Sequence, residues 1–416
     1  MLATPVTLPN GLLLPNRFAK SAMEEELGRL GAPTDAHINL YHNWSSGNPG
    51  LLVTGNVMVD RRAMTDPGAV FLEDESNLQQ FRAWASAGRQ GGNLFLMQIN
   101  HPGRQIPKYL CERPLAPSAV GVEVPGGRGL FNTPRPMSDE EIREQVRRFA
   151  RTASLAVEAG FDGVQVHAAH GYLISQFLSP LTNRREDRWG GSPDNRARFL
   201  FEVLAAVRAV LPRGKALSVK LNSADFQSGG FAEEDALQVI ARLAEFRVDL
   251  LEISGGNYES PAMMDGRGAT SGRHTAQREG FFLEFAEKAR AVAPMPLMVT
   301  GGFRTRRGME EALKFGAVDV IGMAKPFCLE PLLPRKMLNG ELTEVHYPTR
   351  RLRTQAMSSL GVMASARTHI RRIARNRRPD PGLNVVLNLV RDFLSTQLHA
   401  WRYRRWLRKN PGPAAP

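Results

Sequence analysis

Short apolar runs alternate with helical segments along most of this chain, and this alternation restricts the fold more than any other feature. Eight apolar runs each end in small or polar residues. They cover residues 17–23, 51–59, 94–100, 163–167, 217–222, 250–254, 297–300 and 318–323. Near-continuous apolar strands are typical of a parallel sheet that is covered on both faces. The alternation therefore predicts an α/β fold, a (β/α)8 TIM barrel.

Helical spacing in the intervening segments supports the barrel. We predict helices over 35–46, 75–89, 138–159, 194–210, 233–245, 280–292, 305–315 and 331–338. Ser138 and Glu141 form a capping box at the start of the third helix. An open doubly wound sheet is the alternative, but it favours a glycine-rich phosphate loop after the first strand, and residues 18–23 contain no glycine. Asn10-Gly11 between apolar residues predicts a β-hairpin that closes the amino-terminal mouth of the barrel.

The positive charge of the chain is concentrated at its carboxyl end. Residues 351–416 hold 14 Arg or Lys and 2 Asp, whereas residues 1–350 hold 40 basic and 39 acidic residues. We therefore predict a barrel over residues 1–345 and a basic, partly amphipathic helical extension over 346–416. The two cysteines cannot bind an iron–sulfur cluster that needs four thiolates. With no secretory signal and no run of membrane-spanning length, we expect a cytoplasmic protein.

Two imidazoles and a phenol follow the fourth apolar run. His167, His170 and Tyr172 lie within His-Ala-Ala-His-Gly-Tyr. Reactive groups of a barrel enzyme lie at the carboxyl ends of its strands. Two imidazoles can converge on one oxygen atom, and a phenol can transfer a proton. The spacing His-x-x-His also occurs in metal sites, but no third ligand is recognisable, so we predict no metal.

Glycines cluster at the ends of the last three apolar runs. Gly255, Gly301 and Gly302 are among them, and Ala324 and Lys325 follow the eighth run. Glycines allow backbone N–H groups to approach a phosphate closely, and the loops after strands seven and eight are the usual phosphate site of this fold. The predicted ligand carries a phosphate at one end and polar ring edges at the other.

Several segments in this order resemble the Old Yellow Enzyme family of flavin-dependent ene-reductases. They are residues 97–104 (MQINHPGR), 167–173 (HAAHGYL), 176–180 (QFLSP), 183–191 (NRREDRWGG) and 322–327 (GMAKPF). The resemblance spans roughly residues 1–345. It implies a barrel with bound FMN, reduced by NAD(P)H, and hydride transfer to the β-carbon of an α,β-unsaturated carbonyl substrate, an enone or enal.

The resemblance also implies roles for residues of this chain. His167 and His170 would bind the substrate carbonyl oxygen, and Tyr172 would protonate the α-carbon. Gln98 would bind the pyrimidine edge of the flavin, and Lys220 would stabilise the reduced ring. The other cofactor-binding residues implied are Ser21, Ala22, Met23, Gly55, Gly255, Gly301, Gly302, Ala324 and Lys325.

Three residues depart from the family pattern. Lys220 and Lys325 stand where the family usually has arginines, so the charge is kept and the planar fork is lost. Glu24 stands near the flavin and the substrate, where many relatives have threonine or cysteine. We hypothesise that Glu24 lowers the flavin midpoint potential or is itself protonated. It could alternatively turn outward with Glu25 and Glu26 as a solvated acidic run.

The role of the basic extension stays open between three readings. A stripe with helical spacing, from Leu383 to Trp401, could dock on the barrel, lie on a membrane surface, or accompany contacts with nucleic acid or coenzyme A. Nucleic acid is the least favoured partner, and a homo-oligomer remains open. The alternative functions are a 2,4-dienoyl-CoA reductase-like enzyme, a tRNA-acting flavin enzyme of dihydrouridine-synthase type, and a non-catalytic membrane-associated scaffold.

Overall fold

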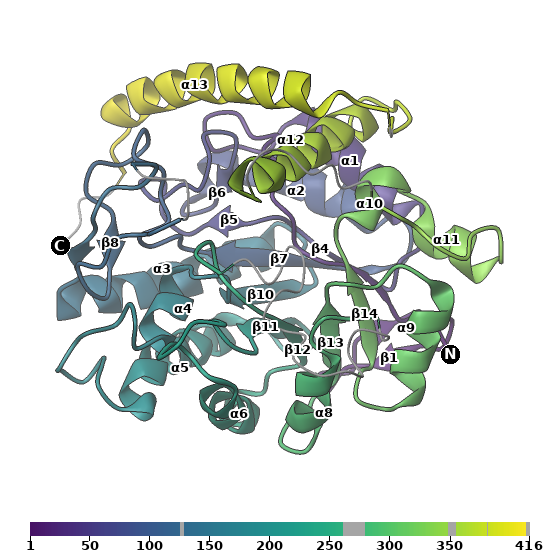
Figure 1. Ribbon diagram of the computed structural model, residues 1–416, viewed down its shortest axis with the longest axis horizontal. Coiled ribbons are helices and arrows are strands. Elements are labelled where there is room, and N and C mark those ends of the chain that lie inside the picture. Colours follow the sequence, from purple (N-terminus) through teal and green to yellow (C-terminus); the bar gives the residue numbers. More distant parts are fainter. Residues whose placement is uncertain (125–128, 261–278, 348–354, 381, 413–416) are drawn as a thin grey trace.

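Eight parallel strands close into a barrel in the computed structural model of the chain (Figure 1). The structure describes residues 1–416 except 125–128, 261–278, 348–354, 381 and 413–416. The strands follow the order β3, β4, β7, β10, β11, β12, β13 and β14, and β14 pairs with β3 to complete the ring. Their bounds are Phe18–Lys20, Leu51–Val53, Leu94–Asn100, Gly163–Ala168, Ala216–Asn222, Leu250–Ser254, Leu297–Thr300 and Val320–Met323. The predicted (β/α)8 barrel is confirmed.

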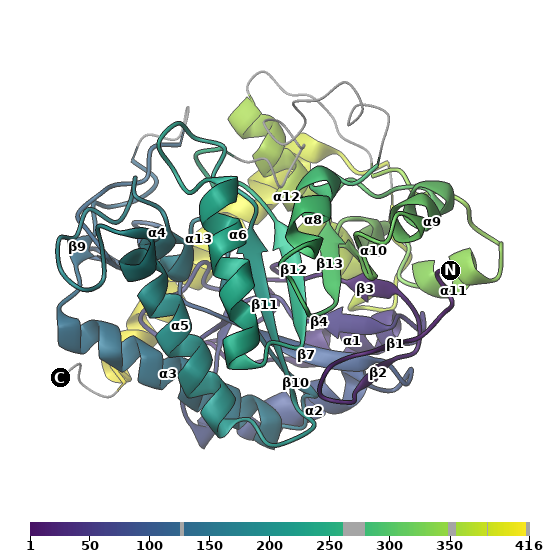
Figure 2. The same ribbon diagram turned by 90° about the horizontal axis from the view of Figure 1, so that it is seen from below.

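Helices surround the barrel, and Figure 2 shows α3, α5, α6 and α8 in a row outside the strands. The helices of the barrel region are α1 Asp35–Ser45, α2 Leu78–Gly88, α3 Asp139–Glu158, α4 Leu173–Leu178, α5 Pro193–Val210, α6 Glu233–Arg242, α8 Leu283–Arg290, α9 Arg306–Lys314, α10 Pro326–Leu329 and α11 Leu333–Leu338. Short 3-10 helices cover Glu75–Asn77 and Leu243–Phe246. The predicted capping box of α3 is present between Ser138 and Glu141. The short helix α4 was not predicted, because its six residues are too few for a periodic signal.

The amino-terminal hairpin closes one mouth of the barrel, as predicted. Strands β1 (Val6–Thr7) and β2 (Leu13–Leu14) pair antiparallel. Their apolar side chains pack with Leu51, Leu94 and Leu250, which are the first residues of β4, β7 and β12. The remaining short strands are β5 Val57–Met58, β6 Val70–Phe71, β8 Leu115–Ala116 and β9 Arg135–Pro136.

The interior of the barrel changes from apolar to polar along the strands. Side chains of alternate strand residues point to the same face. On β11 the sequence Ala216, Ser218, Lys220 therefore leads from the apolar cluster at the hairpin to a charged group at the other mouth. Gln165 is in register with Ser218, and Glu252 is in register with Lys220, so neighbouring strands add polar groups to the same half of the interior. The fold thus concentrates polar groups at the carboxyl ends of the strands.

The described part of the carboxyl-terminal extension contains two helices. Helix α12 (Gln355–Ile373) packs against α1 and α10, and α13 (Val385–Lys409) lies outside α12 as the outermost helix in Figure 1. We predicted a helix near α13, but the reading in which its apolar stripe docks on the barrel is wrong. The buried residues of α13 are Asn388, Asp392, Ala400 and Tyr403, whereas Phe393 and Leu394 are 63% and 62% exposed. No helix in the described ranges is both long and apolar enough to cross a bilayer.

Candidate active site

A chain of hydrogen bonds joins the polar side chains inside the carboxyl-terminal mouth. Gln98 Nε2 donates to Gln165 Oε1 at 2.7 Å, and Gln165 Nε2 donates to Glu252 Oε2 at 2.8 Å. Thr300 Oγ1 donates to Glu252 Oε1 at 2.7 Å and lies 2.7 Å from Ser21 Oγ. This network fixes the orientation of the Gln98 amide, for which the family resemblance implies contact with the flavin edge.

Lys220 is held by a buried carboxylate. Its Nζ lies 2.9 Å from Glu252 Oε1, and the two side chains are 4% and 0% exposed. The pairing keeps a cation inside the barrel at a tolerable cost, because an unpaired buried charge is strongly unfavourable. Sequence reasoning missed Glu252. The sequence does hint at a buried functional carboxylate, because Glu252 is the one acidic residue in the strand Leu250–Ser254.

His167 and His170 face each other at the end of β10. Their ring centroids are 5.1 Å apart, at an interplanar angle of 82°. His167 Nδ1 accepts the N–H of Ala169 at 3.2 Å, which leaves the proton of a neutral ring on Nε2. His170 Nε2 lies 2.8 Å from Ser254 Oγ. His170 also adopts a left-handed backbone conformation, φ 62°, and its N–H donates to Asn222 Oδ1.

Both histidines are neutral at physiological pH. Burial holds the pKa of His167 well below its usual range, and the neighbouring groups His170 and Lys220 lower it further. Burial and Lys220 do the same to the pKa of His170. A neutral imidazole offers one N–H donor and one acceptor. The pair can thus donate hydrogen bonds to one oxygen without placing two positive charges in the site.

Tyr172 lies beside the histidine pair and contacts an acidic residue. Its ring centroid is 4.9 Å from that of His167. The phenol donates to Glu24 Oε1 at 3.0 Å, lies 2.9 Å from the hydroxyl of Tyr258, and accepts from Asn56 Nδ2 at 3.4 Å. Burial and the neighbouring Glu24 raise the pKa of Tyr172 well above its usual range. Tyr172 therefore stays protonated and can serve as a proton donor.

The three consecutive glutamates do not form a solvated acidic run. Glu24 bonds Tyr172 and Asn56, as above. Glu25 is buried and accepts hydrogen bonds from Tyr41, from Lys20 Nζ and from the N–H of Gly55.

The third glutamate, Glu26, ion-pairs with Arg367 of α12. The solvated reading of this segment is wrong because each carboxylate has a partner within the protein.

Gly55 has a packing reason to be glycine. A Cβ atom there would lie 2.1 Å from Glu25 Oε2 and 2.4 Å from Met23 O. The flavin-lining roles of Gly55, Ala22 and Met23 stay predictions. Ala22 and Met23 are half-buried, and the Met23 sulfur lies 3.4 Å from Cys328 Sγ.

The predicted phosphate end lies on two adjacent strands. Gly301 and Gly302 follow β13 with φ of 119° and 93°, a backbone region that favours glycine. Ala324 and Lys325 follow β14, which pairs with β13, and Lys325 immediately precedes α10. Phe281 and Phe282, which sequence reasoning missed, pack against the Gly301 position. The glycine pair and the lysine are thus brought to neighbouring strand ends.

The arrangement fits FMN by the chemistry of its donor set. An oriented amide at Gln98, a paired cation at Lys220, and a glycine pair beside Lys325 match a ring with polar edges and a phosphate. Ser223 Oγ is buried next to Gly255 and has no hydrogen-bond partner among the described residues. The Ser223 hydroxyl can therefore form a hydrogen bond with a polar group of a bound ligand.

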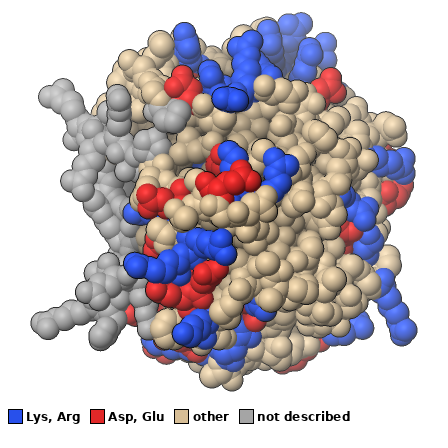
Figure 3. Space-filling model, turned by 90° about the vertical axis from the view of Figure 1, so that its right-hand side faces the viewer, with Lys and Arg blue, Asp and Glu red and all other residues tan. Residues whose placement is uncertain are grey.

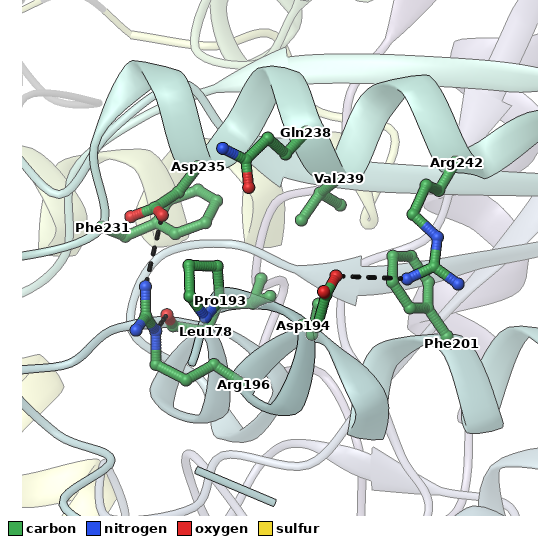
Figure 4. Close-up of a pocket in the computed structure, with 11 residues that line it drawn as sticks. Leu178, Pro193, Asp194, Arg196, Phe201, Phe231, Asp235, Gln238, Val239 and Arg242 are labelled. Carbon is green, nitrogen blue, oxygen red and sulfur yellow. Dashed lines mark hydrogen bonds and ion pairs between the residues drawn. The ribbon is translucent and has the colours of Figure 1, made fainter. Parts of the chain in front are cut away.

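A cleft lies in the outer helical layer and not at the barrel mouth (Figure 4). Its lining residues come mainly from α5 and α6. The charged ones are paired, Arg196 with Asp235 at 3.2 Å and Arg242 with Asp194 at 3.6 Å. These ion pairs join two helices, so we assign this cleft a structural role.

The loop that follows β12, residues 255–280, is described only in part. Met263, Met264, Arg267 and Arg273 fall within 261–278. Tyr258 is described, and it contacts Tyr172.

A closed barrel with a polar mouth, an oriented amide and a histidine pair beside a tyrosine defines a flavin-binding oxidoreductase. The sequence model of the NADH:flavin oxidoreductase / NADH oxidase family matches residues 1–344. The chain belongs to that family, whose cofactor is FMN and whose reductant is NAD(P)H. The resemblance to Old Yellow Enzyme is confirmed.

Curated relatives support the assignment. An NADH-dependent flavin oxidoreductase of Hypocrea jecorina is 38% identical over 365 residues, which are 82% of this chain and 90% of the relative. A protein of the same name from Neonectria sp. is 40% identical, and the chain spans 47% of its length. The NADPH dehydrogenase of Bacillus subtilis is 31% identical over 82% of this chain and 96% of its own.

Solved structures share the fold. The complex of 2-naphthoyl-CoA reductase with 2-naphthoyl-CoA matches with a TM-score of 0.74 and 28% identity, over 82% of this chain and 52% of that one. The Old Yellow Enzyme homologue from Zymomonas mobilis matches with a TM-score of 0.70 and 24% identity, over 82% and 93%.

Proposed function

We propose that this oxidoreductase reduces the carbon–carbon double bond of α,β-unsaturated carbonyl compounds. The observation that carries the proposal is the convergence of His167, His170 and Tyr172 at the end of β10, with ring centroids 4.9 and 5.1 Å apart. When bound, FMN takes hydride from NAD(P)H and delivers it to the β-carbon of the substrate.

His167 and His170 hold the substrate carbonyl oxygen in this proposal. Negative charge builds on that oxygen as the β-carbon receives hydride, so fixed donors lower the barrier. Because burial keeps both imidazoles neutral, they act as hydrogen-bond donors and not as cations. The orienting contacts to Ala169 N–H and Ser254 Oγ keep the two rings in place before substrate arrives.

Tyr172 supplies the proton that completes the reduction. Its O–H bond breaks and a C–H bond forms at the α-carbon, so the double bond gains one hydride and one proton. The phenolate is then reprotonated from water. Glu24, partly exposed and 3.0 Å from the phenol, is placed to pass that proton on. Glu24 thus lies beside the proposed proton donor. The sequence had led us to expect it near the flavin and the substrate.

The test follows the two half-reactions of the FMN-loaded enzyme separately under anaerobic conditions. Tyr172→Phe should leave reduction by NADH or NADPH unchanged and slow reoxidation by 2-cyclohexenone by about 10²–10⁴-fold, the usual contribution of a general acid. Tyr347→Phe is the matched control, since that phenol contacts only Val362 O among the hydrogen-bond partners described. Equal slowing in both half-reactions, or none, would refute the assignment of Tyr172.

A CoA thioester is a second candidate substrate. It is favoured by the structural likeness to 2-naphthoyl-CoA reductase at 28% identity. Adding a 2-enoyl-CoA and 2-cyclohexenone in parallel distinguishes the candidates, because the better substrate reoxidises the reduced enzyme faster. The small-molecule ligand in the name of the 2-naphthoyl-CoA reductase structure favours either candidate over a tRNA substrate.

A further inference from the structure

Helix α13 is attached to the protein by its polar face. Asp392 is buried and pairs with Arg367 at 2.6 Å and with Arg371 at 3.0 Å. Tyr403 is buried, and its hydroxyl donates to Arg61 O at 2.7 Å. Trp406 packs on Phe71, with ring centroids 5.9 Å apart. These contacts fix which side of the helix faces outward.

The outward side of α13 is a continuous apolar stripe. Its large apolar side chains are 46–63% exposed and recur three or four residues apart, so they lie on one face. We call this set the α13 stripe: Val386, Leu387, Val390, Phe393, Leu394, Leu398 and Trp401. Its 16-residue span corresponds to about 24 Å of helix. Contiguous exposed apolar surface of this kind marks an interaction site.

Exposed cations flank the stripe at both ends, and one of them, Arg391, lies within its span. They are Arg375, Arg377, Arg378, Arg391, Arg402, Arg404, Arg405, Arg408 and Lys409. Acidic residues in the described part of 355–412 are limited to Asp380 and Asp392, neither of which is exposed. Figure 3 shows Lys and Arg gathered along the upper edge of the molecule, where Figure 1 places α12 and α13.

We propose that the α13 stripe docks on an anionic phospholipid surface, with the helix lying in the plane of the interface. An apolar face of an amphipathic helix inserts at the boundary between headgroups and acyl chains, and flanking cations bind anionic headgroups. Trp401 stands where the stripe meets the basic end, a position suited to an amphipathic ring. The ring of Trp401 also receives Arg405, whose guanidinium carbon lies 5.7 Å from its centroid.

A second copy of the chain is a weaker candidate for the occupant. In a two-fold interface each copy presents the same patch, so the exposed cations of one copy would face those of the other. Such a contact places like charges together. The described surface of 355–412 offers no exposed carboxylate to neutralise them. An anionic membrane supplies both the apolar layer and the opposite charge.

Vesicle flotation of the full-length FMN-loaded protein tests the proposal. We expect flotation with vesicles of phosphatidylcholine and phosphatidylglycerol, loss of flotation with pure phosphatidylcholine, and weakening by salt. Phe393→Gln combined with Leu394→Gln should reduce the bound fraction at least about ten-fold. Phe315→Gln is the matched control, because Phe315 is equally exposed at 63% but lies at the end of α9.

A second variant tests the contribution of the basic residues. Arg404→Glu combined with Arg405→Glu changes only exposed residues and should also abolish flotation. Flavin content and circular dichroism verify folding of each variant. Absence of flotation of the unmodified protein in low salt would overturn the proposal. So would equal flotation of the Phe393/Leu394 variant, or a dimer in sedimentation velocity that this variant dissociates while no form of the protein binds vesicles.

Discussion

Glu24 shows at the scale of one residue how the site departs from a simple histidine–tyrosine arrangement. Its carboxylate accepts hydrogen bonds from both Tyr172 and Asn56, so it lies against the proposed proton donor. A negative charge there opposes further negative charge nearby. This explains why the pKa of Tyr172 is raised by Glu24 as well as by burial.

Replacing Glu24 by glutamine should raise the flavin midpoint potential, because a charge that opposes reduction is removed while the shape is kept. We expect a rise on the order of 30 mV, equivalent to about 1.4 kcal/mol for a two-electron couple. Reductive titration against a reference dye measures it. Glu158→Gln on the surface of α3 serves as the control and should leave the potential unchanged. An unchanged potential in the Glu24 variant would remove this electrostatic role.

His101 should make the stability of the protein sensitive to acid. Its Nδ1 accepts the N–H of Gly103 at 3.0 Å, and burial lowers its pKa to about 4 from 6.5. Below pH 6.5 the unfolded chain takes up a proton that the folded chain refuses, so stability is lost as pH falls from 6.5 to 4. The loss amounts to about 3 kcal/mol. Urea unfolding of wild type and His101→Asn across this range should show a shallower pH dependence in the variant; parallel curves would contradict the assignment.

Among the secondary-structure elements, helix α12 connects the carboxyl-terminal extension to the segment that contains Glu24 and Glu26. Arg367 is 16% exposed and pairs with Glu26, two residues from Glu24, and with Asp392 of α13. One guanidinium thus links the barrel loop, α12 and α13. Burial and neighbouring carboxylates raise the pKa of Glu26, and Arg367 opposes that rise.

Arg367→Ala should therefore lower the free energy of unfolding by about 3–5 kcal/mol, the cost of breaking a buried ion pair from one side. Urea unfolding followed by tryptophan fluorescence measures the change. Adding Glu26→Gln should recover part of the loss, since it removes the stranded charge. Arg307→Ala breaks an exposed pair on α9 and should change stability by less than about 1 kcal/mol. If both arginine variants behaved alike, the buried network would contribute little.

For the whole molecule, the alternation of apolar runs and helical segments was sufficient to predict the barrel, and the hairpin followed from Asn10-Gly11. Strand ends then brought His167, Tyr172 and Lys220 to one mouth, as expected. Glu252 was missed because a charge inside an apolar run indicates burial only once its partner is known. The predicted docking of the apolar stripe of α13 on the barrel was wrong for a related reason. The helix docks through Asp392 and Tyr403, and their partners Arg367 and Arg61 are not recognisable from periodicity.

The proposed function requires FMN in the polar mouth and an enone held there by the histidine pair. Anaerobic visible spectroscopy of the purified protein tests it most directly. We predict a flavin spectrum that bleaches on addition of NADH or NADPH and returns on addition of 2-cyclohexenone, with cyclohexanone formed in equal amount. A colourless protein that FMN cannot reconstitute, or a bleached flavin that only oxygen restores, would contradict the account.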